Sequence, residues 1–215
     1  MSRSTISVVR RFLILALLLL GTLLHDRRAL AQTVSISAGV GVDVKRFSGS
    51  PDTSVLDTSS PVVELGLAAT ATPNLSVHLE VGLEGSSTVT KTSDVRLAEV
   101  RTSYTSRMHT VSVLAGVHPA ATGRFRWNVV AGLTFVNFNR KTVFDSPQLP
   151  PGTSAIPRPA EFVDRVAAAT VGADAAVHIT EHFAIVPAIR AHAFRLAAEL
   201  SGFSVCPSVG VQWTF

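Results

Sequence analysis

The run of side chains most suggestive of chemistry is His178-Ile179-Thr180-Glu181-His182. Two histidines four residues apart, with a glutamate beside one of them, can bind zinc and activate a water when a helix places both imidazoles on one face. Here the run leaves an extended, alternating segment and enters a tight turn, so we expect the two imidazoles to diverge. The sequence therefore predicts no metal site, no catalytic residues and no cofactor.

A second set of ionisable side chains recurs at alternate positions and so shares one side of several extended segments. It comprises Asp43, Lys45, Glu64, His78, Glu80, Glu84, Arg126, Asp174, Arg190 and His192. Acids and bases are mixed in it, and an unpaired charge in a low-dielectric interior is costly, so we expect them to pair. One contact follows from the turn at 180–182, which places Asp174 diagonally near Arg190. The set is interpreted as a structural polar interior, with a functional pathway as the alternative.

The elements that must position these side chains are strands. Apolar residues alternate with small or polar ones at a period of two, which no amphipathic helix produces. The alternation covers residues 33–47, 63–71, 75–84, 111–117, 125–135, 167–178, 183–193 and 205–215, and the segment at 111–117 has an upper part, 101–109, that is polar on both faces. Several of these segments exceed the five or six residues usual in soluble sheets and match the roughly 9–11 that cross a bilayer at a tilt.

The connections between these segments differ in length from one end to the other. Long connections are expected at 48–61, 85–100 and 143–163, with a shorter one at 198–203; the tight or short ones are 72–74, 119–124 and 180–182. Short turns on one rim and longer loops on the other are typical of an outer-membrane barrel. The sequence predicts an all-β fold, an eight-stranded antiparallel up-and-down transmembrane β-barrel.

The first 31 residues have the layout of a secretory signal peptide. A basic start is followed by the apolar run Phe12–Leu24 and by Ala29-Leu30-Ala31, after which cleavage is expected. The alternative, a membrane anchor, needs about 20 apolar residues. We therefore predict a signal peptide at 1–31 and one barrel domain at 32–215.

Composition excludes some functions. The whole chain has 19 Lys+Arg and 15 Asp+Glu, and residues 1–31 hold five of the bases against one acid, so the rest carries 14 of each. Without a basic cluster interleaved with aromatics, nucleic-acid binding is not expected. Cys206 has no second cysteine to pair with and is interpreted as a small filler.

An alternating strand buries one face, and that face can point inward, as in a soluble periplasmic barrel, or outward into lipid. The opposite face consists of glycine, serine, threonine and alanine with a few charges of both signs, which suits a narrow polar lumen, so we expect the apolar face to be outside. Phe125, Trp127, Phe183, Trp213 and Phe215 would form one aromatic girdle, and Phe47, Phe135, Phe138, Phe162 and Phe203 the other. Pro187 and Pro207 fall inside strands, where a bulge or local irregularity is expected.

The chain ends in Gly210-Val211-Gln212-Trp213-Thr214-Phe215. This segment resembles the C-terminal signal strand of bacterial outer-membrane barrels, and the whole chain is similar to small barrels of the OmpA and OmpX type. The resemblance implies a Gram-negative outer-membrane location. It also implies contact with outer-membrane lipid and lipopolysaccharide, and recognition of Gly210, Trp213 and Phe215 by the outer-membrane assembly machinery.

Three functions remain open. The first is a non-enzymatic structural or surface-interaction role in the cell envelope; the second is a narrow porin-like channel. The third, a lipid A-modifying enzyme, lacks the His-x-Ser pair of the deacylase type and any acid–base pair on its lipid face. Arg101, Arg107 and His109 lie high on one strand and could contact lipopolysaccharide phosphates, or could belong to a solvated extracellular extension.

Overall fold

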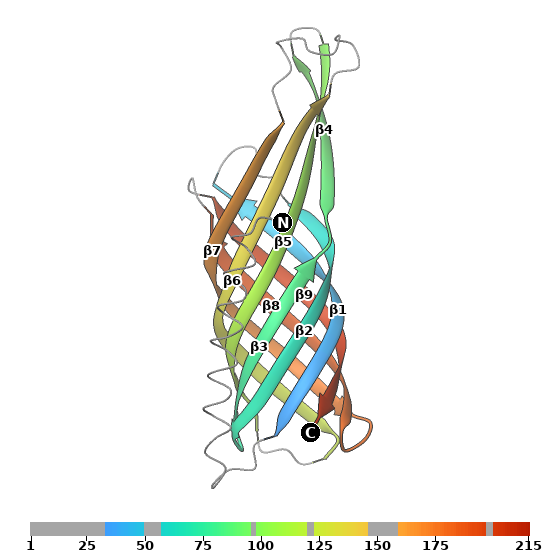
Figure 1. Ribbon diagram of the computed structural model, residues 1–215, viewed down its shortest axis with the longest axis vertical. Helices are drawn as coiled ribbons and strands as arrows, with labels where there is room; N and C mark the ends of the chain where they lie inside the picture. Colours follow the sequence, from blue (N-terminus) through green and yellow to red (C-terminus); the bar gives the residue numbers. More distant parts are fainter. Residues whose placement is uncertain (1–32, 50–56, 96–97, 120–122, 146–158, 197–199) are drawn as a thin grey trace, which may run out of the picture.

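The chain forms antiparallel strands that wrap into a tilted barrel (Figure 1). The computed structural model describes residues 33–49, 57–95, 98–119, 123–145, 159–196 and 200–215; the predicted signal peptide lies outside them. The strands are β1 (Val34–Ser48), β2 (Thr58–Thr72), β3 (Leu75–Glu84), β4 (Ser87–Val95), β5 (Ala98–Val117), β6 (Phe125–Asp145), β7 (Ala160–His178), β8 (Phe183–Arg195) and β9 (Ser201–Thr214). No helix in the described part of the chain is long and apolar enough to cross a membrane.

The barrel has eight wall positions. Apart from β3 and β4, each strand pairs with the next along the chain; the first strand pairs with the last (β1 with β9), and β3 closes the ring by pairing with β5. Strands β3 and β4 occupy one position, because both pair with β5, through Leu83–His109 and then Ser87–Ser106. The predicted eight-stranded antiparallel up-and-down barrel is confirmed.

The predicted long connection at 85–100 is wrong, because this range contains all of β4 and the start of β5. Likewise, the range 48–61 includes the beginning of β2, and the range 143–163 includes the end of β6 and the beginning of β7. Residues 58–61 and most of β4 are polar on both faces, whereas 143–145 and 160–163 carry apolar residues such as Val143 and Phe162 without a regular alternation. Their pairing continues where no apolar belt requires one face to be apolar, and so the alternation that identifies a strand is lost.

The register of β6 against β7 is continuous from Phe125–Val177 to Thr142–Ala160. The blurred alternation around Asn137-Phe138-Asn139 is therefore no irregularity of the strand. Phe138 points into the barrel, while Asn137 and Asn139 lie on the outer side just beyond Phe135, where the continuous apolar face of β6 ends.

The two prolines inside strands cause local gaps and no bulge. Pro187 pairs with Val209 on one side, whereas on the other side the β7–β8 pairing is interrupted between Asp174–Ala188 and Val177–Ile185 without a change of register. Pro207 likewise pairs with Ile189 and interrupts the ladder toward β1. Proline has no backbone N–H to donate to one of its two neighbouring strands, so each proline interrupts the pairing with that strand only.

The outward face is apolar, as expected. Large exposed side chains include Val40, Leu65, Leu133, Val171 and Val209. The girdle near the short turns is present, with Phe125, Trp127, Trp213 and Phe215 exposed.

The opposite girdle was predicted wrongly at three of its five residues. Phe47 and Phe138 are buried inside the barrel, and Phe162 packs against the same interior cluster. Each of the three lies an even number of residues from an inward polar residue of its own strand: Lys45 on β1, Asn128 on β6 and Thr170 on β7. The alternation itself therefore required these three rings to point inward.

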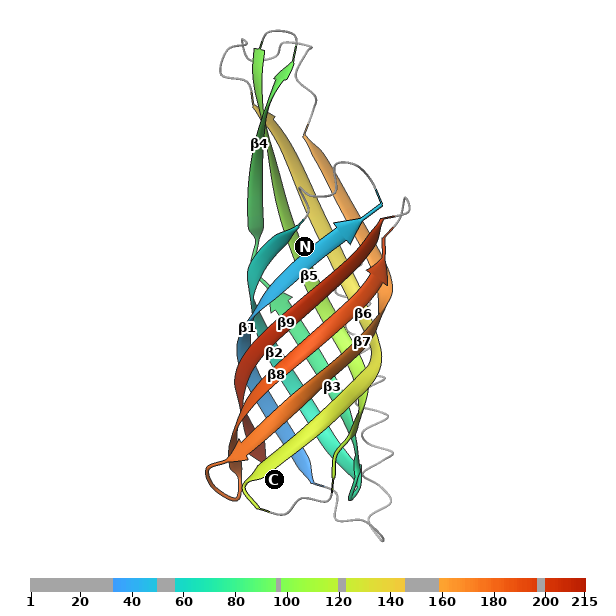
Figure 2. The same cartoon turned by 180° about the vertical axis from the view of Figure 1, so that it is seen from behind.

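The wall is much taller on one side (Figures 1 and 2). Strands β5 and β6 have 20 and 21 residues, against 13 in β8, which makes them longer by about 25 Å at roughly 3.3 Å per residue. Residues 160–167 of β7 pair with β6 but, among the described residues, with no strand on their other edge. We call β4, β5 and β6 beyond the closed wall, with 160–167 of β7, the four-stranded extension.

Candidate functional site

The candidate site is the lumen, because all ten ionisable residues predicted to form the polar interior lie at inward positions. An eight-stranded barrel has an interior just wide enough for side chains to fill it. Within the wall, Gly39 of β1 is paired with Gly210 of β9, and a Cβ on Gly210 would lie 2.7 Å from the carbonyl oxygen of Ala38. Glycine is needed here for backbone contact.

Lys45 is at the centre of a sealed group of polar side chains in the half of the lumen nearer the extension. Its ammonium donates to Glu84 Oε1 and, at 3.2 Å, to Ser60 Oγ, and it lies 3.9 Å from Asp43 Oδ2. The side chains of Lys45 and Glu84 are 0% and 2% exposed. The second oxygen of Glu84 accepts the backbone N–H of Met108 at 2.5 Å, at the junction where β3 gives way to β4. We call Asp43, Lys45, Ser60 and Glu84 the Lys45 cluster.

A second ion-pair group, the Arg190 cluster, lies nearer the short turns. Arg190 donates through Nε to Glu80 Oε2 at 2.9 Å and through Nη1 to Asp174 Oδ1 at 2.5 Å. The predicted contact between Asp174 and Arg190 is thus present, and it is diagonal, since Gly172 is the direct partner of Arg190. Arg190 also binds an acid across the lumen that the sequence did not pair with it.

A chain of hydroxyl groups links four strands beside these clusters. Ser112 contacts Thr134 at 2.7 Å, Thr134 contacts Thr170 at 2.5 Å, and Thr170 contacts His192 Nδ1 at 2.8 Å. All four side chains are buried. The predicted lumen residue His192 therefore ends a hydrogen-bonded row from β5 to β8.

An apolar plug fills the end of the lumen next to the extension. It consists of Phe47, Met108, Val136, Phe138, Ala168, Phe194 and Leu196. The ring of Phe47 lies 5.6 Å from that of Phe138 and 5.9 Å from that of Phe194, centroid to centroid. Such tilted and edge-on contacts are the favoured arrangement of aromatic pairs.

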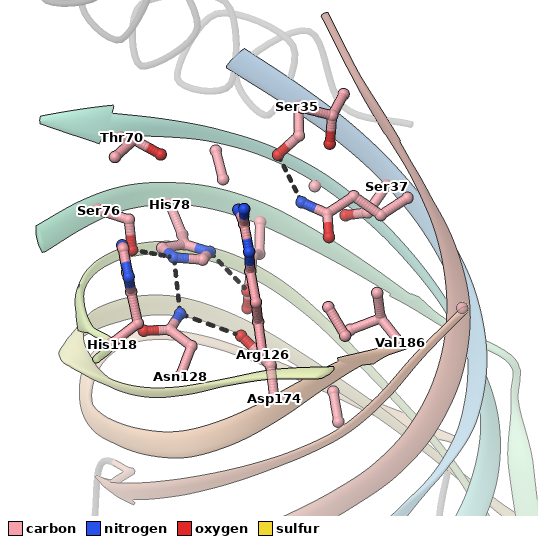
Figure 3. A pocket seen from close by; sticks show the side chains of 18 of the residues that line it. Ser35, Ser37, Thr70, Ser76, His78, His118, Arg126, Asn128, Asp174 and Val186 are labelled. Atoms are coloured by element: carbon pink, nitrogen blue, oxygen red, sulfur yellow. Dashed lines mark hydrogen bonds and ion pairs between the residues drawn. The ribbon is translucent and has the colours of Figure 1, made fainter. Parts of the chain in front are cut away.

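At the opposite end, a cavity of about 620 Å³ opens between the short turns. We call it the vestibule (Figure 3). Its lining includes Asn128, whose amide nitrogen lies 3.0 Å from His78 Nε2 and donates to Asp174 Oδ2 at 3.4 Å. Gln212 donates to Ser35 at 2.6 Å on the far side. The vestibule extends inward as far as Glu64, Glu80 and Arg190.

The remaining predicted residues lie at the edges of this arrangement. Arg126 lines the vestibule and is exposed, and Glu64 accepts a hydrogen bond from the Cys206 thiol at 3.4 Å. His178 lines the vestibule, whereas the ring of His182 stacks on Trp213 with centroids 5.7 Å apart. The two histidines of the zinc-like motif thus belong to separate environments.

The chemistry available to the lumen is ion pairing and hydrogen bonding. Among the described residues, no three His, Cys, Asp or Glu side chains are grouped to hold a metal ion. Side chains at the levels of the Lys45 cluster and the plug, among them Val136, Ser204 and Thr134, are inaccessible to water. The lumen is therefore a polar vestibule below two closed layers.

Sequence reasoning missed the plug and the hydroxyl chain. Both could have been found by continuing the period-two alternation past the apolar belt. That rule assigns Phe138, Val136 and Thr134 to the face of Asn128. It cannot identify partners across the lumen, such as Glu80 for Arg190, which lie 110 residues apart.

Comparison with solved structures places this architecture among bacterial outer-membrane β-barrels. The chain is similar to a major outer membrane protein from Thermus thermophilus, with a TM-score of 0.56, 13% identity, and coverage of 86% of this chain and 100% of that one. For Neisserial surface protein A the TM-score is 0.52 and the identity 10%, with coverage of 86% of this chain and 96% of that one. For the N-terminal β-barrel domain of Pseudomonas aeruginosa OprF the TM-score is 0.51 and the identity 16%, with coverage of 85% of this chain and 97% of that one.

Comparison with protein-family models and with curated protein sequences gave no match. The structural likeness at these identities shows the fold: the chain has the eight-stranded barrel fold of bacterial outer-membrane proteins.

Proposed function

We propose that this protein is a non-enzymatic barrel of the bacterial outer membrane that contacts partners outside the cell through its four-stranded extension. The fold likeness to the Thermus outer-membrane protein and the apolar outer face support the location. In such barrels the short turns face the periplasm and the longer connections face outward. The extension then projects from the cell surface, and the vestibule opens to the periplasm.

The observation that carries the proposal is the pair of open strand edges on the extension. Among the described residues, β4 is paired along β5 only, and residues 160–167 of β7 along β6 only. An open edge presents backbone N–H and C=O groups to which an extended segment of another protein can add as a further strand. Thr88 and Thr90 bridge to Thr105 and Ser103 at 3.0 and 3.1 Å and hold this edge extended.

The two other candidate functions have less support. A channel is favoured by the vestibule, but the plug and the Lys45 cluster fill the lumen beyond it. A lipid-modifying enzyme needs an acid–base pair exposed to lipid, and the outward side chains around Leu133 and Val209 are apolar.

The test compares cells that carry equal amounts of folded barrel. A trimmed variant removes residues 90–103 and joins Val89 to Tyr104, which are paired neighbours, through an Asn-Gly turn. The matched control T88A/T90A removes two threonine contacts but keeps the backbone edge.

We expect adhesion of the cells to host-cell or matrix-coated surfaces to fall in the trimmed variant and to persist in the control. Equal adhesion by cells with the full and the trimmed extension would refute the proposal. Unboiled and boiled samples of the outer-membrane fraction, compared on a denaturing gel, verify location and folding.

A further inference from the structure

Cations gather on the outer surface of the barrel where the apolar belt ends on its tall side. On β5, β6 and β7 the continuous outward apolar rows end at Val111, Phe135 and Ala167, which are paired in that order. Val143 and Val163 are isolated outward apolar residues beyond them. The next outward rows contain the basic side chains. We call the following residues the basic band: Arg107, His109, Lys141, Arg165 and Arg195.

The strand register brings the members of the band together. His109 faces Asn137, which faces Arg165, and one row higher Arg107 faces Asn139. Lys141 is two residues beyond Asn139, and so its Cβ lies about 8 Å from that of Arg107, the usual diagonal spacing. Long arginine and lysine side chains can close this gap onto a single anionic group.

The band has an excess of positive charge. Arg107, Lys141, Arg165 and Arg195 are exposed. The acid among them is Glu161, which faces Lys141 and accepts a hydrogen bond from the Asn139 side-chain nitrogen at 3.0 Å. Arg165 also has an interaction of its own within the protein. With four permanent cations against one acid, the band complements an anionic partner.

The other borders of the apolar belt differ from this one in the part of the chain that the structure describes. At the turn end, the border of the apolar belt is aromatic, with Trp127 and Trp213 about half exposed. On the short side, the outward Arg46 is held by Asp57 at 3.3 Å. Cations therefore gather at the border of the apolar belt nearer the extension and not at the border nearer the short turns. This asymmetry fits a membrane whose two leaflets carry different headgroups.

We propose that the basic band binds the phosphate groups of lipopolysaccharide in the outer leaflet, with its acyl chains against the apolar rows of β5, β6 and β7. The inference rests on the proposed outer-membrane location. Arginine and lysine recognise phosphate by charge-assisted hydrogen bonds. Asn137 and Asn139, at the same level, offer further donors toward the sugar and phosphate oxygens.

The test measures the affinity of the full, folded protein in detergent micelles for labelled lipopolysaccharide. The variant R107Q/K141Q/R165Q removes three cations of the band. A cation near an anionic surface contributes roughly a fivefold change in affinity, so we expect a loss of about a hundredfold. The matched control R46Q/K91Q/R124Q removes three exposed cations elsewhere, and we expect a change of less than about twofold, since none of the three lies in the band.

The charge-conserving variant R107K/K141R/R165K should retain most of the affinity. A similar loss in the band variant and in the control would overturn the proposal. Equal binding of lipopolysaccharide stripped of its phosphates would also overturn it, and so would equally strong competition by inorganic phosphate or phosphatidylglycerol vesicles. Failure of the location itself is recognised separately, as absence of the protein from the outer-membrane fraction.

Discussion

Removing the charge of Glu84 is the sharpest test of the sealed lumen. In Glu84→Gln the ammonium of Lys45, which has no solvent exposure, loses its closest partner and keeps Asp43 at 3.9 Å. Breaking a buried ion pair from one side costs about 3–5 kcal/mol. Because Asp43 remains, we expect the lower value, about 3 kcal/mol of unfolding free energy, or roughly a hundredfold in the folding equilibrium.

The matched control is Glu80→Gln in the Arg190 cluster. The side chain of Glu80 is 21% exposed to the vestibule, and Arg190 keeps its bond to Asp174. We expect a loss of about 1.5 kcal/mol, the lower end for a hydrogen bond to a charged group.

Both variants would be unfolded with urea in lipid vesicles. Folding would be followed by the different gel migration of unboiled samples and by the fluorescence of Trp127 and Trp213. The double variant K45M/E84Q should cost less than the sum of its parts, because neither charge is then stranded by removal of the other. A loss below about 1 kcal/mol for Glu84→Gln, or equal losses for the two glutamates, would refute the reasoning.

Three further predictions concern other parts of the barrel. Phe138→Ala should lower the unfolding free energy by about 3–5 kcal/mol, because it opens a cavity in the plug, and denaturant titration in vesicles measures this. Leu133→Arg, in the lipid-facing belt, should lower the unfolding free energy in bilayers by about 2–4 kcal/mol, and Val143→Arg, above the belt, by about 0–1 kcal/mol. Equal losses for the two variants would favour a soluble barrel whose apolar face points inward. Phe215→Ala should reduce the amount of barrel in the outer membrane while refolding in vesicles is unchanged, and a parallel loss in both assays would argue against a signal role.

The sequence determined the strands that cross the apolar belt. Each has one face toward an apolar phase and one toward a polar interior, so the period of two is imposed on every residue pair. That is why Leu75–Glu84 was predicted with its observed limits, and why Asp43, Lys45 and Arg190 were assigned to the interior. The diagonal contact of Asp174 with Arg190 followed too, because a tight turn fixes the register of the two strands that it joins.

Only the tertiary structure decided what happens beyond the belt and across the lumen. β4 and the upper part of β5 carry polar residues on both faces, so hydrogen bonding between strands holds them without leaving a periodic pattern. The pairing of Lys45 with Glu84 and of Arg190 with Glu80 depends on how the closed sheet staggers its strands around the ring. Closure joins residues distant along the chain, and no local spacing in the sequence encodes which inward side chains then meet.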